Sequence, residues 1–259
     1  ILLGNSHAES IHYNLSEKLE EINLDLVFFK TNYFPKMKFI NRKNNKETFP
    51  EMSKKNMRIK EFFKNNKDLT IIYFSRMSHH ILDGDLFDNF EGGKEWDADA
   101  TKDQKLKEIL VKQNFSSLDK DLRQKEILNN IYRNLEFIRN LGHNIIIVYP
   151  FPEIGFNVPK KLFRDRNKKK LPIYSINYEV YKKRNQLLIN IFNKINDENI
   201  YKVYPDKIFC NNILKNRCIT NSENVIYYAD DDHPSYEGSK IINDLIMKKI
   251  EIIRVKKNN

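Results

Sequence analysis

Residues 1–8 read ILLGNSHA, and this opening indicates the class of fold. Its first three apolar residues form a run too short for a helix, and the Gly-Asn-Ser that follows ends the run. From residue 7 to residue 22, apolar residues recur at helical spacing. The opening therefore predicts a buried strand that leads directly into a helix. Ser6 would lie at the carboxyl end of that strand, where open α/β sheets hold their ligands.

The same alternation of strand and helix continues along the chain. Apolar runs predict further strands over residues 24–30, 69–75, 144–149 and 200–204, and helical spacing predicts helices over residues 52–66, 118–141, 176–195 and 235–253. Near-continuous apolar strands between helices are typical of a parallel sheet covered on both faces. We therefore predict an α/β fold, a three-layer α/β/α sandwich with a parallel sheet of about five strands.

The length of 259 residues allows one large α/β domain or two small ones. No Pro/Gly/Ser-rich linker divides the chain, so we expect a single domain over residues 1–259. No stretch reaches the roughly 18–20 uncharged apolar residues that span a bilayer. Because the first residues already predict a strand, we expect this domain to be part of a longer protein.

The formal net charge of +10 raises the question of a nucleic-acid partner. Lysines are spread over the whole chain and mix with acids along the predicted helices. Only residues 160–170 (KKLFRDRNKKK) form a basic cluster, and it lacks the interleaved aromatic residues on which bases stack. We expect no nucleic-acid partner. The cluster would face phosphate-bearing glycans or lipid headgroups, or it would be a solvated loop.

The two cysteines, Cys210 and Cys218, lie close together in an Asn-rich segment. Two interpretations stay open. A disulfide would close a short loop and indicate an oxidising compartment, whereas two reduced thiols would indicate nothing further. No second pair of ligands with zinc spacing accompanies them, so we predict no metal site.

A serine and a histidine near opposite ends of the chain suggest one catalytic site. A serine hydroxyl is a poor nucleophile until an imidazole takes its proton, and the imidazole needs an anion to fix its tautomer. Ser6, His233 and Asp230 supply these three roles, with Asp230 three residues before His233 and just ahead of the last helix. The alternative for Ser6 is a helix cap. We expect Asp231 and Asp232 to be solvated or to cap the loop, and the other histidines to lie at the surface or at helix ends.

The two end motifs also carry a family resemblance. In chain order the residues are Gly4-Asn5-Ser6-His7-Ala8, Arg76, Tyr149-Pro150-Phe151-Pro152, the Cys210/Cys218 pair and Tyr227-Tyr228-Ala229-Asp230-Asp231-Asp232-His233-Pro234-Ser235. They resemble the SGNH (GDSL-like) hydrolase superfamily and, more narrowly, the SGNH domain at the carboxyl end of membrane acyltransferase-3 proteins. The resemblance covers essentially the whole chain. It implies the flavodoxin-like SGNH fold and a Ser-His-Asp triad. It also implies that this domain is the carboxyl-terminal part of a longer membrane protein.

Several residues depart from the family pattern. Asn5 stands where the family often has Asp, and it is not the triad acid. No glycine follows the second predicted strand, where the family places an oxyanion-hole residue, and Arg76 falls near the place of the family's asparagine. Our candidates for oxyanion or substrate binding are therefore the Ser6 backbone N–H, Asn32 and Arg76. A structural ion pair is an equally open interpretation of Arg76.

The resemblance implies an O-acyltransferase of cell-surface glycans. A membrane acyltransferase-3 domain in the same chain would deliver an acyl group, usually acetyl, from a cytoplasmic donor, and no cofactor would be bound. Ser6 would be acylated, and a glycan hydroxyl, for example on lipopolysaccharide, would accept the group on the periplasmic or extracytoplasmic side of a bacterial membrane. The alternatives are a free-standing carbohydrate esterase and a catalytically silent domain that binds glycan.

Overall fold

The computed structural model describes residues 1–31, 39–40, 47–48, 50–82, 86–95, 120–168 and 170–258. Its centre is a five-stranded sheet with the strand order β2-β1-β5-β6-β8, and every neighbouring pair in it is parallel. The strands are β1 (Leu2–Gly4), β2 (Phe28–Lys30), β5 (Thr70–Phe74), β6 (Asn144–Val148) and β8 (Ile200–Val203). The predicted parallel sheet of five strands is confirmed.

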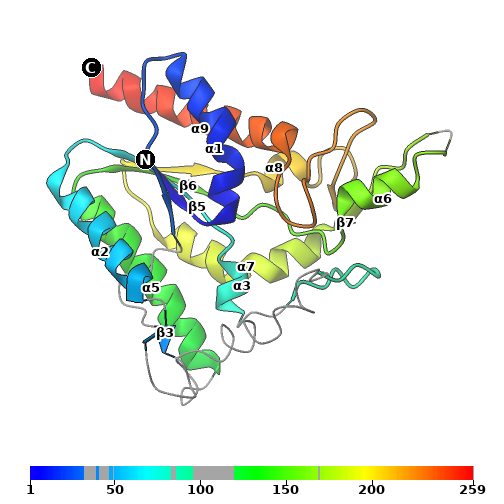
Figure 1. The fold of residues 1–259 in the computed structure, drawn as a ribbon, viewed down its shortest axis with the longest axis horizontal. Helices are drawn as coiled ribbons and strands as arrows, with labels where there is room; N and C mark the ends of the chain where they lie inside the picture. Colours follow the sequence, from blue (N-terminus) through cyan, green and yellow to red (C-terminus); the bar gives the residue numbers. More distant parts are fainter. Residues whose placement is uncertain are drawn as a thin grey trace.

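Helices cover both faces of the sheet (Figure 1). The long helices are α1 (Ser6–Glu20), α2 (Pro50–Asn65), α5 (Lys120–Asn140), α7 (Tyr178–Lys194) and α9 (Tyr236–Asn258). Two separate apolar clusters form because successive side chains of a strand point to opposite faces. Leu2 belongs to the cluster that includes α1 and α9 side chains, and Leu3 belongs to the one that includes side chains of α2, α5 and α7. Both leucines are fully buried, each contributing about 2 kcal/mol of burial free energy. The three layers predicted from the sequence are present.

The second strand is shorter than predicted. Residues 24–30 were expected to be extended and paired, but only Phe28–Lys30 pairs with β1. Strand β1 consists only of Leu2–Gly4, so β2 has three residues of β1 to pair with and its ladder ends there. Leu24 and Val27, which precede the ladder, are exposed.

Several short elements were not predicted. Helices α3 (Ser78–Ile81), α6 (Val158–Arg164) and α8 (Asp206–Phe209) are short, and so are the strand pairs β3 (Phe39–Ile40) with β4 (Glu47–Thr48) and β7 (Ser175–Asn177) with β9 (Arg217–Ile219). Helix α6 contains the first part of the basic cluster, for which a solvated loop was one of the two interpretations. Its cap is Asn157, whose side chain accepts a hydrogen bond from the Lys160 amide at 2.9 Å.

A disulfide joins Cys210 to Cys218, next to β9. Of the two interpretations that the sequence left open, the structure therefore shows the disulfide. In the described ranges, no helix combines the length and the apolar character needed to cross a bilayer.

Candidate active site

The turn between β1 and α1 places Ser6 at the carboxyl edge of the sheet. Gly4 packs so tightly against β5 that an added Cβ would overlap the carbonyl oxygen of Phe74. Ser6 is the first residue of α1, so its backbone N–H has no acceptor within the helix. Such an amide, at the positive end of the helix dipole, favours negative charge near the serine.

Asn5 connects this turn to the end of β5. Its Oδ1 accepts hydrogen bonds from the backbone N–H of His7 at 3.2 Å and from that of Arg76 at 3.1 Å. An amide oxygen accepts both bonds as a carboxylate oxygen would. The departure from the family's Asp at position 5 therefore leaves this connection intact.

His233 reaches Ser6 from the loop before α9. Its Nε2 lies 2.8 Å from Ser6 Oγ, and its Nδ1 lies 2.8 Å from Asp230 Oδ2. The other oxygen of Asp230 accepts the backbone N–H groups of His233, at 2.8 Å, and Asp232, at 2.9 Å, which fixes the carboxylate within the loop. The structure thus brings together the three side chains that the sequence singled out, in one chain of hydrogen bonds.

Asp232 is a second carboxylate on the same imidazole. Its Oδ1 lies 2.8 Å from His233 Nδ1, and its Oδ2 lies 2.9 Å from Arg76 and 3.2 Å from His7 Nε2. The residue is only 4% exposed. The expectation that Asp232 is solvated or loop-capping is wrong, because Arg76 and His7 provide a buried site for its charge.

These contacts shift the protonation of the site. Burial opposes the charged imidazolium of His233, but the hydrogen bonds to Asp230 and Asp232 outweigh it and raise the pKa of His233 to about 10. Burial also opposes the carboxylate of Asp232, but hydrogen bonds from His233 and His7 hold its pKa well below the ordinary value. Burial lowers the pKa of His7, which is 1% exposed, so His7 is the neutral partner in this group.

Arg76 forms a buried ion-pair network. Its guanidinium lies 2.9 Å from Glu95, 2.6 Å from Glu153 and 2.9 Å from Asp232. Arg184 of α7 also pairs with Glu153, at 3.2 Å. The structural ion pair that the sequence left open for Arg76 is therefore present. Its side chain is held by carboxylates, and its role as an oxyanion donor stays a prediction. Asn32, another predicted donor, lies outside the described residues.

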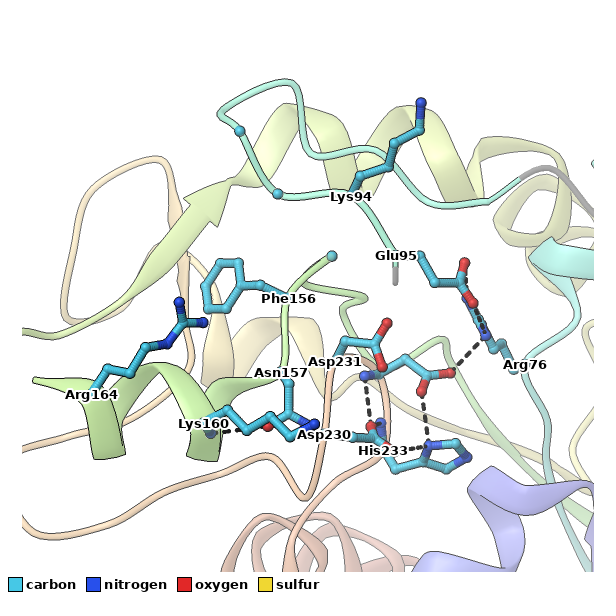
Figure 2. Close-up of a pocket in the computed structure, with 14 residues that line it drawn as sticks. Arg76, Lys94, Glu95, Phe156, Asn157, Lys160, Arg164, Asp230, Asp231 and His233 are labelled. Carbon is cyan, nitrogen blue, oxygen red and sulfur yellow. Dashed lines mark hydrogen bonds and ion pairs between the residues drawn. The ribbon is translucent and has the colours of Figure 1, made fainter. Parts of the chain in front are cut away.

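A cavity of about 720 Å³ opens beside His233 (Figure 2). Ser6 lies beyond the described lining of this cavity and is connected to it through the His233 ring. The lining comprises Arg76, Gly92, Gly93, Lys94, Glu95, Gly155, Phe156, Asn157, Lys160, Arg164, Asp230, Asp231, Asp232 and His233. The loop over residues 92–95 supplies one wall of the cavity.

The side chains here fit an ion-pair network better than a metal site. One ligand atom from each of His7, Asp232 and His233 lies within 4.8 Å of the others, as a cation would need. However, Arg76 already supplies the positive charge at Asp232 Oδ2, and the His233 ring holds the other oxygen. A divalent ion would have to displace both.

Three residues of the site were missed from the sequence. His7, Asp232 and Glu153 are buried and charged or polar, and all contact residues distant in the chain. Glu153 did carry a signal: it follows the apolar β6 and the Pro-Phe-Pro segment at the same edge of the sheet as Ser6.

Comparisons with known proteins agree with this architecture. The family model described as "SGNH domain (fused to AT3 domains)" matches residues 1–248. Among solved structures, the periplasmic domain of a lipopolysaccharide acetyltransferase from Salmonella ser. Paratyphi A superposes with a TM-score of 0.57 at 18% identity, covering 96% of this chain and 81% of that one. At this identity the likeness shows the fold alone. A comparison with curated protein sequences gave no match.

Proposed function

Because the chain belongs to the family of SGNH domains fused to AT3 domains, we propose that it transfers an acyl group, acetyl in the first instance, through Ser6 to a hydroxyl of a cell-surface glycan. The observation that carries the proposal is the hydrogen-bonded chain from Asp230 through His233 to Ser6. Glycan acyl transfer is also the chemistry of the lipopolysaccharide acetyltransferase whose periplasmic domain shares this fold.

In the first half-reaction Ser6 Oγ attacks the carbonyl carbon of the acyl donor. His233 Nε2 accepts the hydroxyl proton as the new C–O bond forms, and it then gives that proton to the leaving group as the old bond breaks. The product is an ester of Ser6. Asp230 and Asp232 accept the Nδ1–H of His233 and so stabilise the imidazolium that forms during the step.

In the second half-reaction a glycan hydroxyl replaces the donor. Its proton passes to His233 Nε2, its oxygen attacks the ester carbonyl, and the bond to Ser6 Oγ breaks. The proton returns to Ser6 Oγ, which restores the resting enzyme. In both half-reactions the negative oxygen of the tetrahedral intermediate would accept the backbone N–H of Ser6, with Asn32 as a second donor.

An AT3 domain in the same protein is the proposed source of the acyl group, and no cofactor is needed within the SGNH domain itself. The family description supports this partner, since it names SGNH domains that are fused to AT3 domains. We place the domain on the extracytoplasmic side of a bacterial membrane. The disulfide between Cys210 and Cys218 supports this location, because disulfides persist in oxidising compartments.

The proposal is tested by labelling the wild-type domain with a fluorophosphonate and by measuring its turnover of p-nitrophenyl acetate. We expect both signals in the wild type and neither in Ser6→Ala. The matched control is Ser10→Ala on the next turn of α1, where the hydroxyl donates only to the backbone oxygen of His7. A folded wild type without labelling or turnover would overturn serine catalysis by the domain and favour a silent glycan-binding role.

Esterase activity is the second candidate, because water can attack the ester of Ser6 in place of a sugar hydroxyl. The triad is the same for both outcomes, so the ratio of transfer to hydrolysis depends on which acceptor occupies the cavity. Adding acceptor glycan to the assay should raise acylated sugar at the expense of free acid. An unchanged yield of acid with every acceptor would assign the domain as an esterase.

A further inference from the structure

The cavity beside His233 has two unlike sides (Figure 2). His233 and Arg76 lie on one side. Lys160 and Arg164 project from α6 on the other side, and Lys94 extends from the loop over residues 92–95. We call the two cations Lys160 and Arg164 the outer basic group.

The charges on the inner side are compensated within the protein. Arg76 is paired with Glu95, Glu153 and Asp232. Asp230 and Asp232 share the imidazole of His233. A charged ligand would find no uncompensated partner among these six groups.

Asp231 is the remaining acid that lines the inner side. Burial, with the nearby charges of Asp232 and Asp230, raises its pKa to about 7. Near neutral pH the carboxyl group of Asp231 is therefore partly protonated, which weakens its repulsion of an anionic ligand.

The outer basic group is not compensated in the same way. Lys160 and Arg164 make no ion pair with any residue in the described ranges, whereas Lys94 pairs with Asp88 at 3.8 Å. Lys161, the next residue of α6, behaves differently, because its ammonium stacks on the rings of Phe156 at 3.9 Å and Tyr174 at 4.4 Å. Lys160 and Arg164 are thus available to a ligand, while their neighbour Lys161 is engaged by aromatic rings.

We propose that the outer basic group binds an anionic substituent, a carboxylate or a phosphate, on the acceptor sugar, so that the acceptor is an acidic glycan. The inference rests on the proposed function and narrows its substrate class. The reacting hydroxyl would face His233, and the anionic substituent of the same or the adjoining sugar would face Lys160 and Arg164. A guanidinium and an ammonium both form charge-assisted hydrogen bonds to such oxygens.

The test is a binding measurement on the Ser6→Ala protein, which does not depend on turnover. Amide chemical shifts are followed by NMR during titration with methyl β-D-glucuronide, glucose 6-phosphate and methyl β-D-glucoside. We expect the better of the two anionic sugars to bind about tenfold more tightly than the neutral glucoside. The preferred anion identifies the substituent. The preference should shrink in high salt, because these cations are partly exposed.

Two matched double variants locate the effect. Lys160→Gln/Arg164→Gln should bring the affinity for the anionic sugars down to that for the glucoside. Lys248→Gln/Arg254→Gln removes one Lys and one Arg from exposed positions of α9 and should change nothing. Equal affinity for all three sugars, or an equal loss in both double variants, would overturn the inference.

An anionic membrane is the competing ligand for the outer basic group. Binding to phosphatidylglycerol vesicles that is lost in Lys160→Gln/Arg164→Gln, with no preference among the sugars, would assign the group to lipid and overturn the inference. Fluorophosphonate labelling of the wild type keeps the two proposals distinct. Labelling without any preference among the sugars would overturn only the acidic-glycan inference. A preference for acidic sugars without labelling would overturn only the proposal of serine catalysis.

Discussion

His233 shares its Nδ1 atom between Asp230 and Asp232, and this pair of carboxylates holds the imidazole in its protonated form. With its pKa raised to about 10, the ring is mostly imidazolium at neutral pH, and its Nε2 can accept a proton from Ser6 only in the small neutral fraction. We therefore expect kcat/KM for p-nitrophenyl acetate to rise about tenfold per pH unit from pH 7 and to level off near pH 10. The rate measured with Ser6→Ala at each pH is subtracted, because p-nitrophenyl acetate also hydrolyses without the enzyme. A plateau already at pH 7 would contradict the raised pKa.

The two carboxylates can be separated by substitution. In Asp230→Asn or Asp232→Asn one carboxylate still accepts the Nδ1–H of His233, so the tautomer is kept while the pKa of the ring falls. We expect each single variant to move the rise in kcat/KM to lower pH, and the double variant to lose at least about 100-fold in kcat/KM.

Stability distinguishes the two variants further. Asp232 is buried against Arg76, so Asp232→Asn should lower the free energy of unfolding by about 2 kcal/mol in urea titrations. Asp230→Asn, at a more exposed position, should cost less. Equal stability of the two variants would contradict the role of Asp232 as the buried partner of Arg76.

We expect the Asp231 carboxylate to lower the stability of the folded protein in neutral solution. Its folded-state pKa is raised to about 7, from an unfolded value near 3.8, so the folded state binds more protons between these limits and loses stability as pH rises through them. Asp231→Asn removes this penalty. Discounted for partial exposure, the gain should be about 1–2 kcal/mol at pH 8 and smaller at pH 5, measured by urea unfolding at both values. A gain that is equal at the two pH values would contradict the titration.

At the scale of residues, the sequence predicts the site residues that a local motif identifies. Ser6 is recognisable after a strand, and Asp230 is recognisable three residues before His233. The roles of His7 and Asp232 are not recognisable, because they contact each other across 225 positions of the chain. A run of three aspartates gives no indication of which carboxylate the fold will bury.

At the scale of elements, the junction of β1 with α1 depends on a residue without a side chain. A methyl group at position 4 would overlap the backbone oxygen of Phe74 and would lie 2.8 Å from the Cβ of Ala8. Gly4→Ala must therefore push β1 away from β5 or α1. We expect a loss of about 3 kcal/mol in unfolding free energy together with at least a tenfold loss of fluorophosphonate labelling rate. Gly142→Ala is the comparison in thermal melts. An alanine there is strained by the φ of 80°, but its Cβ would have no atom within 4 Å. Position 142 is far from Ser6, so the labelling rate should not change. Loss of stability without loss of labelling in Gly4→Ala would contradict the proposed coupling.

The long elements were predictable because their periodicity is internal. The apolar run of Asn144–Val148 predicts a buried strand from its own residues. The helical spacing of apolar residues in Lys120–Asn140 likewise predicts a helix with one buried face. The short elements contain too few residues to show such a periodic pattern. Strand β7 forms by antiparallel pairing with β9, in which Ile176 lies opposite Cys218. The sequence around neither residue indicates that pairing.

At the scale of the whole molecule, the site depends on both ends of the chain being folded together. Helices α1 and α9 lie side by side (Figure 1), joined by hydrogen bonds from Ser239 Oγ to Ser10 O at 2.9 Å and from Asn243 Nδ2 to Ile11 O at 3.0 Å. Fluorophosphonate labelling should therefore disappear in the same urea transition as helical circular dichroism. Labelling that is lost at lower urea would show that α9 detaches before the sheet unfolds.

The sheet also separates the chain termini from the cavity. The Ile1 amino group donates to the carbonyl of Thr70 at 2.7 Å, and Lys257 near the other end donates to the carbonyl of Asp68 at 2.8 Å. Both contacts lie at the amino end of β5, whereas Ser6 and Arg76 follow the carboxyl ends of their strands. An affinity tag, a fluorophore or a solid support joined at either terminus is thus attached at the opposite pole from the cavity. Such a protein can be immobilised with the cavity beside His233 facing the solution, which suits it to surface-based measurements with polymeric glycans.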